Sequence, residues 1–342
     1  MKNSLTTICI CGGGSLGHVI AGTAAARGFR VNLLSPRAET WDEEITVHAC
    51  DGKIFRGRLS RKSADAKKVV PNADFVLLCV PGYLIRPTLE KISGALSTGT
   101  PVGSVVSSSG FFFAAREILP AGTPLFGFQR VPYIARVEEY GNSAELLGYK
   151  NELNLAAENF APIEGERFRE RIETLFATPT RLLESFWDAA LTNSNPLLHP
   201  CRLYGMWKDW DGKSVFRNCP RFYEDWDDFS SETLLSADEE FFTLLDKLPA
   251  TPGAIPRLRD YYESPNASAL TRKLRSIPAF RKILAPMVRV SDGFIPDIRN
   301  RYFTEDIPFG MQIIKNLAVE FGVETPTINK ILKWAGELPP PY

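Results

Sequence analysis

Cys11-Gly12-Gly13-Gly14-Ser15-Leu16-Gly17 is the stretch that decides the fold. It follows the short apolar run Thr7 to Ile10 and opens a helix-like stretch from Leu16 to Arg27, so the order is strand, glycine turn and helix. Its glycines have the G-x-G-x-x-G spacing of a dinucleotide-binding crossover. In that crossover the first glycine permits the tight turn, the second admits a pyrophosphate, and the third lets the helix pack on the strand.

We therefore predict a dinucleotide site at this turn, because the first turn of the helix presents free N–H groups to an anion. The expected contacts come from the turn and the start of the helix: Gly12, Gly14, Ser15, Leu16 and Gly17. A glycine-rich turn that holds no ligand is the alternative interpretation.

The end of the second strand selects the cofactor. Arg30 to Leu34 is the expected strand, and an NAD site usually ends this strand with an acid for the ribose 2′-hydroxyl. Here Ser35 follows the strand and Arg37 lies two residues on. A guanidinium can hold a 2′-phosphate, with Ser35 and Thr40 adding hydrogen bonds, so we predict NADP(H). The alternative is that Arg37 is a solvated surface arginine and that NAD binds without an acidic clamp.

Strands and helices alternate up to about residue 125, which predicts a parallel, doubly wound Rossmann-type sheet with ligand at the carboxyl ends of its strands. Ala73 to Val80 is a continuous apolar run, as expected of a strand buried on both faces. Val80 and Pro81 end that run and should pass close to the cofactor, although plain turn chemistry explains them equally well. Thr180 to Glu184 is the expected last strand of this domain.

Further along the chain, apolar residues recur at helical spacing, which predicts a mostly α-helical second half. The segments concerned are Phe186 to Thr192, Leu234 to Leu248, Ala269 to Leu274 and Met311 to Phe321. A chain of 342 residues is long enough for two cores. We expect a dinucleotide-binding domain over residues 1–184 and a helical substrate and catalytic domain over residues 185–342.

Composition narrows the classes of partner. Lysine plus arginine equals aspartate plus glutamate, 40 of each, so there is no basic footprint for nucleic acid. No apolar run approaches the ~20 residues needed to span a bilayer, and Met1 to Ser4 lead into a strand rather than a signal-peptide core. The six cysteines are scattered without a C-x-x-C pair, which predicts free thiols in a reducing cytosol and no metal site.

Histidine is scarce, and only one of the three stands where catalysis is expected. His18 follows the glycine turn and is expected in packing or at the surface, whereas His48 lies in a polar strand-like segment with no partner in sight. His199 ends a helix-like stretch where the second domain begins, and it can face the cofactor there. It can exchange a proton near neutral pH, so spacing alone leaves catalysis and a structural role equally open.

Two segments of the second half resemble the opine dehydrogenases of the octopine/nopaline type. Asn193 through Pro200 is similar to the histidine motif of that family, and Arg301-Tyr302-Phe303-Thr304-Glu305-Asp306-Ile307-Pro308-Phe309-Gly310 resembles its Arg-…-Thr-Glu-Asp-…-Pro segment. Gly127 to Tyr133 is a weaker likeness, and the resemblance runs from the glycine turn to Lys333-Trp334. The histidine and Thr-Glu-Asp segments are specific together, whereas many dehydrogenases share the glycine turn.

The resemblance implies an NAD(P)-dependent enzyme that reduces the imine formed between an amino acid and a 2-oxo acid, reversibly, to a secondary amine dicarboxylate. It implies His199 as the general acid/base, with Asp306 bonding the other imidazole nitrogen and stabilising the cation. Arg301 would clamp the carboxylate of the 2-oxo acid, and Gln129 would add a hydrogen bond to that substrate. The residues alone leave two structural alternatives to these roles: Glu305 and Asp306 could cap a helix, and Arg301 could be a surface charge.

Other classes of protein stay open. Ketopantoate reductases and glycerol-3-phosphate dehydrogenases share the two-domain plan, but they usually rely on a catalytic lysine, and no lysine here stands in a comparable motif. A non-catalytic NADP(H)-binding sensor would keep the fold, although the presence of His199, Arg301 and Asp306 together argues against it. The identity of the amino acid is not readable from the sequence, and a homodimer is one of the oligomeric states left open.

Overall fold

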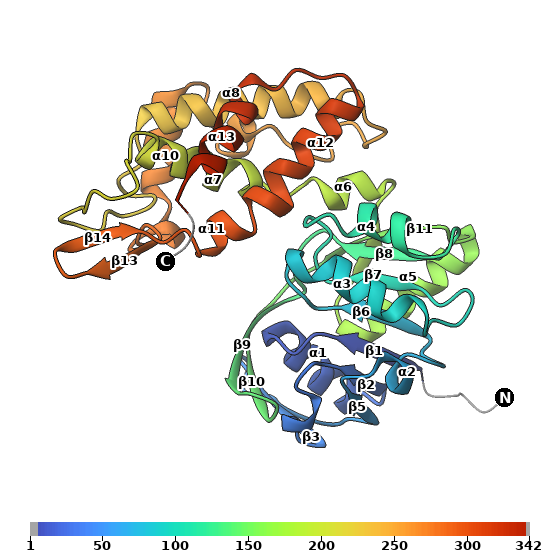
Figure 1. The fold of residues 1–342 in the computed structure, drawn as a ribbon. Helices are drawn as coiled ribbons and strands as arrows, with labels where there is room; N and C mark the ends of the chain where they lie inside the picture. Colours follow the sequence, from blue (N-terminus) through green and yellow to red (C-terminus); the bar gives the residue numbers. More distant parts are fainter. Residues whose placement is uncertain (1–5, 340–342) are drawn as a thin grey trace. The chain divides into compact units, whose positions relative to one another are not determined.

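A computed structural model describes residues 6–339, and the chain divides into two compact units, Met1–Thr192 and Asn193–Tyr342 (Figure 1). Met1 to Ser4, where we expect no signal peptide, lie outside the described residues. The units divide eight residues after the boundary predicted between residues 184 and 185, so helix α6 (Phe186–Ala190) falls in the first unit. The boundary between the two functional domains stays a prediction.

The first unit contains the predicted Rossmann-type sheet. From edge to edge its strands are β12 (Thr180–Leu182), β11 (Leu153–Glu158), β8 (Leu125–Phe128), β7 (Val102–Ser104), β6 (Phe75–Leu78), β1 (Thr7–Cys11), β2 (Arg30–Leu34) and β5 (Arg61–Ser63). The pairs from β8 to β5 are all parallel, whereas β11 runs antiparallel to β8. Within this unit the helices are α1 (Ser15–Ala26), α2 (Ala66–Val69), α3 (Gly82–Ser93), α4 (Phe111–Ile118), α5 (Pro162–Phe176) and α6.

A second sheet in this unit was not expected from the sequence. Its four strands, in spatial order, are β4 (Ile54–Arg58), β3 (Glu44–Ala49), β10 (Ser143–Tyr149) and β9 (Tyr133–Glu139). Helix α1 packs against both sheets, and eight consecutive residues from Gly17 to Ala24 are buried. A helix that is covered on all sides reads as apolar all round, and this burial explains the Ala- and Gly-rich sequence of α1.

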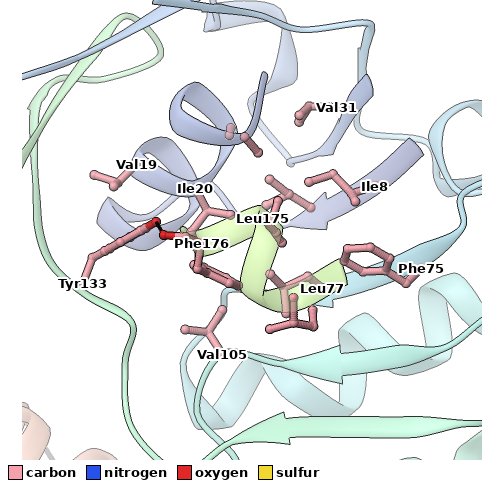
Figure 2. Close-up of a cluster of buried hydrophobic side chains, with 14 of the residues drawn as sticks. Ile8, Val19, Ile20, Val31, Phe75, Leu77, Val105, Tyr133, Leu175 and Phe176 are labelled. Atoms are coloured by element: carbon pink, nitrogen blue, oxygen red, sulfur yellow. Dashed lines mark hydrogen bonds between the residues drawn. The ribbon is translucent and has the colours of Figure 1, made fainter. Parts of the chain in front are cut away.

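The core of the first unit lies where α1 and α5 meet the buried central strands. Figure 2 shows Ile8, Phe75 and Leu77 from the sheet beside Ile20 of α1 and Phe176 of α5. Each of these side chains is at most 1% exposed. Burying one such side chain contributes roughly 1.5–3 kcal/mol, so the predicted apolar strands and the helices packed on them both stabilise this unit.

The second unit is mostly α-helical, as predicted. Its helices are α7 (Asn195–Trp207), α8 (Asp228–Leu245), α9 (Leu258–Tyr261), α10 (Ala267–Ser276), α11 (Arg301–Thr304), α12 (Gln312–Glu320) and α13 (Pro326–Glu337), and its hairpin is β13 (Met287–Val290) with β14 (Gly293–Pro296). Helix α7 packs on α8 and is buried along most of its length. Helix α7 carries His199, and Asp306 is the N-cap residue of a π-helical segment, Ile307–Met311, that contacts α7.

Candidate active site

The glycine turn has the geometry that a dinucleotide requires. Gly12 has φ +124°, and a Cβ there would stand 2.4 Å from the carbonyl oxygen of Cys79, so the turn needs glycine at this position. A Cβ on Gly17 would overlap the carbonyl oxygen of Gly12, which explains the close approach of helix and strand. Beside Gly14, by contrast, no heavy atom lies within 4 Å of the position a Cβ would take. A pyrophosphate therefore has room at Gly14.

The start of α1 offers the anion its donors. Gly14 is the N-cap residue and provides no side-chain hydrogen bond to the first turn, which begins with Ser15 and Leu16. The free N–H groups and the positive end of the helix dipole both favour a phosphate at this place. Val80 lies against the turn, because its Cγ1 is 3.0 Å from where a Cβ of Gly12 would be, and Pro81 follows as the N-cap of α3. These residues fit a bound dinucleotide.

A buried serine and an arginine follow strand β2. The Ser35 hydroxyl is 3.5 Å from that of Tyr140 and accepts a hydrogen bond from the Arg37 N–H at 3.3 Å. The Arg37 guanidinium carbon stands 3.7 Å from the centroid of the Tyr140 ring, and Arg37 is exposed. The Thr40 hydroxyl donates to the Arg37 carbonyl at 2.9 Å. Ser35, Arg37 and Thr40, which we expect to select the cofactor, therefore form one polar cluster with Tyr140.

Histidines 18 and 48 are accounted for by contacts within the first unit. His18 is fully buried beneath the glycine turn and stacks on Trp41 with ring centroids 3.9 Å apart. Its Nδ1 contacts the Gly14 carbonyl at 3.0 Å, and its Nε2 accepts the Gly141 N–H at 2.7 Å. His48, on β3, forms an exposed contact of 2.9 Å with Glu138, a partner that the sequence did not reveal.

The predicted pair of His199 and Asp306 is in contact. Nδ1 of His199 is 2.7 Å from Oδ2 of Asp306, although 107 residues separate them in the chain. The His199 side chain is 6% exposed and that of Asp306 is 16% exposed, so the pair is largely shielded from water. Asp306 makes no side-chain capping hydrogen bond to the segment that follows it, which removes helix capping as the explanation for its carboxylate. An ionised carboxylate only accepts, so His199 donates its Nδ1–H.

Tyr223 and Tyr302 complete the surroundings of His199, and sequence reasoning missed both. The Tyr223 hydroxyl is 2.9 Å from Nε2 of His199, and the Tyr302 ring stacks on the imidazole at 3.8 Å. Burial raises the pKa of the Tyr223 phenol well above its ordinary value, and burial followed by the charge of Asp306 raises that of Tyr302. Both phenols therefore stay protonated at neutral pH. Tyr302 lies inside the Arg301 to Gly310 segment that carries the family resemblance, whereas Tyr223 lies in a loop without periodicity.

The two predicted substrate-binding residues have different surroundings. Arg301 begins the single-turn helix α11, five residues before Asp306, and its side chain is exposed with no ion pair among residues 6–339. Its guanidinium is thus available to an anion. The Gln129 amide is already occupied within the first unit, since its Nε2 donates to the Asp188 carbonyl at 3.3 Å and its Oε1 accepts from Asn154 at 3.0 Å.

Comparison with known proteins finds a different family model for each part of the chain and opine dehydrogenase relatives over nearly all of it. Residues 182–338 match the family model described as the alpha-helical domain of NAD/NADP octopine/nopaline dehydrogenase, and residues 7–113 match the N-terminus of NAD-dependent glycerol-3-phosphate dehydrogenase. Octopine dehydrogenase of Mizuhopecten yessoensis is 28% identical over 96% of this chain and 89% of that protein. Tauropine dehydrogenase of Arabella iricolor is 25% identical over 98% of this chain and 91% of that protein.

The chain is an NAD(P)-dependent oxidoreductase of the opine dehydrogenase type. A solved octopine dehydrogenase with NADH and L-arginine superposes with a TM-score of 0.86 and 26% identity, over 97% of this chain and 89% of that one. A ketopantoate reductase from Ralstonia solanacearum superposes with a TM-score of 0.63 at 16% identity, which shows a shared fold only. The opine dehydrogenase resemblance of the sequence is thereby confirmed, together with the fold class.

Two further observations bear on partners. No helix within residues 6–339 combines the length and apolar character that crossing a bilayer demands. In the same residues no group of three or more His, Cys, Asp or Glu side chains is arranged to hold a metal ion.

Proposed function

We propose that this opine dehydrogenase-type enzyme reduces the imine formed between an amino acid and a 2-oxo acid, and oxidises the product in reverse. The contact between His199 and Asp306 is the observation that carries this proposal. A histidine paired with a carboxylate on one nitrogen holds a fixed tautomer, and its other nitrogen can exchange a proton near neutral pH. Among the relatives, solved octopine dehydrogenases contain NADH with L-arginine or with pyruvate, which supports these substrate classes.

In this proposal His199 handles the proton while the amine and the 2-oxo acid condense and while the imine is reduced. Protonated His199 is the source of the proton for the oxygen that leaves as water, and Asp306 stabilises the imidazolium through the Nδ1 hydrogen bond. Nicotinamide, when bound, supplies the hydride for the imine carbon. Burial of His199 and its partners keeps bulk water away from the proton transfer.

The exposed Arg301 supports a carboxylate clamp. Its planar fork can form two parallel hydrogen bonds with the carboxylate of a 2-oxo acid, which an ammonium cannot reproduce. We assign Gln129 a weaker role, as a hydrogen-bond donor to the same acid, because its amide would first have to release its contacts within the first unit. Arg301→Lys should raise the KM of the 2-oxo acid and leave the Kd of the cofactor unchanged.

We propose that NADPH is preferred over NADH. Ser35 in place of an acid and the stacking of Arg37 on Tyr140 support this choice, because the ring holds the guanidinium beside the end of β2. Among structural neighbours, yersinopine dehydrogenase has been solved with NADP⁺ and octopine dehydrogenase with NADH. Dissociation constants of the wild-type protein for the two cofactors test the preference directly.

A turnover assay tests the reaction itself. NADPH or NADH is supplied with pyruvate and a panel of amino acids, and consumption of the cofactor is followed together with formation of the secondary amine. The enzyme should use at least one pair of substrates, and His199→Ala should abolish that turnover while the cofactor still binds. Cofactor binding without turnover for any pair, in either direction, would instead favour an NADP(H)-binding sensor.

We further propose the cytoplasm as the location of the protein. We also propose a homodimer as its oligomeric state, to be tested by sedimentation.

A further inference from the structure

The nitrogen of His199 that should exchange protons is already occupied. In the neutral imidazole Nδ1–H is donated to Asp306, so Nε2 carries the lone pair and accepts from the Tyr223 hydroxyl at 2.9 Å. His199 is 5% exposed and Tyr223 is 4% exposed, so water has little access to this hydrogen bond. A proton can reach or leave Nε2 only through the phenol or after the phenol has moved away.

Packing holds the Tyr223 ring in place. It stacks on Phe280 with centroids 4.1 Å apart and an interplanar angle of 16°. On its other neighbour, Trp226, the centroid distance is 5.9 Å and the angle is 7°. Phe222 makes an edge-to-face contact with the Tyr223 ring, at a centroid distance of 4.9 Å and an angle of 83°. Swinging the phenol off His199 would break these aromatic contacts, each of which contributes about 0.5–1.5 kcal/mol beyond its burial.

Helix α7 itself fixes the loop that carries Tyr223. Arg202 lies one turn after His199 on this helix and is 2% exposed. Its Nε donates to the Phe222 carbonyl at 3.0 Å, and its Nη1 donates to the Asp227 carboxylate at 2.6 Å. Arg202 Nη2 also donates to the Asp225 carbonyl, so the same helix positions both the imidazole and, through Arg202, the backbone on either side of the phenol.

We propose that the Tyr223 hydroxyl relays protons to and from Nε2 of His199. This inference rests on the proposed function of His199 in imine formation and reduction. When His199 gives up a proton, Nε2–H passes it to the phenol oxygen, and the original O–H proton leaves for the acceptor. One proton is transferred overall, no bond to carbon changes, and the phenol is neutral before and after. The reverse direction uses the same steps in the opposite order.

Tyr302 lies beside the buried pair. Its ring stacks on His199, and it is partly exposed. The order of exposure is thus from the buried His199 and Tyr223 to the accessible Tyr302. A raised phenol pKa suits a relay, because neither tyrosine is left as a stable phenolate.

The test replaces Tyr223 by phenylalanine, which removes only the hydroxyl and keeps the aromatic stack. Because the chain has three histidines, ¹⁵N spectra of the imidazoles resolve His199, and His199→Gln assigns its signals. In Tyr223→Phe we expect the Nε2 signal to shift and the Nδ1 signal to stay. We also expect kcat to fall ten-fold or more, with the Kd of NADPH and the KM of the 2-oxo acid changed less than two-fold.

Tyr204→Phe is the matched control, since Tyr204 is also a buried tyrosine of the second unit, lies on α7 and packs on Trp334. It should leave both the spectrum and kcat unchanged. An unshifted Nε2 signal in Tyr223→Phe would overturn the hydrogen bond, and a shifted signal with undiminished kcat would overturn the relay. Failure of the wild-type enzyme to turn over any amine and 2-oxo acid pair would overturn the proposed function and the relay with it, even where the Nε2 shift is observed.

Discussion

Two buried histidines, one in each unit, have opposite kinds of partner. His18 lies between two backbone groups, the Gly14 carbonyl on Nδ1 and the Gly141 N–H on Nε2. His199 lies between two side chains that can exchange or follow a proton, the Asp306 carboxylate and the Tyr223 hydroxyl. Burial alone therefore does not mark a catalytic histidine, because the chemistry of the partners decides whether its proton can move.

The partners of His18 specify the neutral imidazole. A backbone N–H can only donate, so Nε2 must carry a lone pair, and Nδ1–H then donates to the Gly14 carbonyl. Burial lowers the pKa of His18. The hydrogen bond to the Gly14 carbonyl acts in the opposite direction, and the charge of Arg37 lowers the pKa further. This histidine ties the glycine turn to the loop at Gly141, and its role is structural.

The largest expected effect is the loss of turnover in His199→Gln. We expect kcat to fall by about 10²–10⁴, because a general acid/base contributes that much, while the Kd of NADPH stays within two-fold. Asp306→Asn should also lower kcat. The double variant should be little worse than His199→Gln alone, because the two side chains act as one unit. Strict additivity in steady-state kinetics would show that the pair does not act together.

The second effect is a loss of stability, without a loss of turnover, when His18 is replaced. His18→Ala should destabilise the protein by about 2–4 kcal/mol, because it opens a cavity beside Trp41 and leaves two buried backbone groups without partners. At saturating NADPH its kcat should remain close to that of the wild type. Denaturant unfolding and kinetics measure the two quantities, and a kcat loss as large as that of His199→Gln would erase the distinction between the histidines.

The third effect concerns the nucleotide turn that His18 supports. Arg37→Ala should weaken NADPH binding about ten-fold or more, since a charge-assisted hydrogen bond contributes about 1.5–3 kcal/mol, and should leave NADH binding unchanged. Calorimetry with both cofactors measures the difference. Arg136→Ala, another arginine of the first unit, serves as the control variant. Equal losses for the two cofactors would mean that Arg37 does not read a 2′-phosphate.

The smallest effect is a pH dependence of stability. The pKa of His18 is lowered in the folded state, so between that value and the ordinary value of about 6.5 the unfolded chain binds more protons. Stability contributed by neutral His18 is therefore complete above about pH 6.5 and is lost as the pH falls below it. The difference in unfolding free energy between the wild type and His18→Gln, measured from pH 8 to pH 5, should shrink toward acid pH. A constant difference would contradict the assignment of a neutral imidazole.

Contiguous features were predictable from the sequence because backbone sterics and burial act over a few residues. The glycine spacing predicted strand, turn and helix, and the structure requires glycine at Gly12 and Gly17 for the predicted reasons. Strand β2 spans Arg30–Leu34 as predicted. The helical second half followed from its apolar periodicity. The pairing of His199 with Asp306 came from the family resemblance, since no local pattern joins residues 107 positions apart.

Only the tertiary structure decided which groups complete each histidine. Gly141 reaches His18 across 123 residues, and Tyr223 reaches His199 from a loop 24 residues away whose course depends on Arg202. Neither contact leaves a trace in composition, spacing or periodicity, because each is set by how separate elements pack. The sequence by itself therefore determined the fold class and named the histidine, whereas packing determined the hydrogen-bond partners of that histidine.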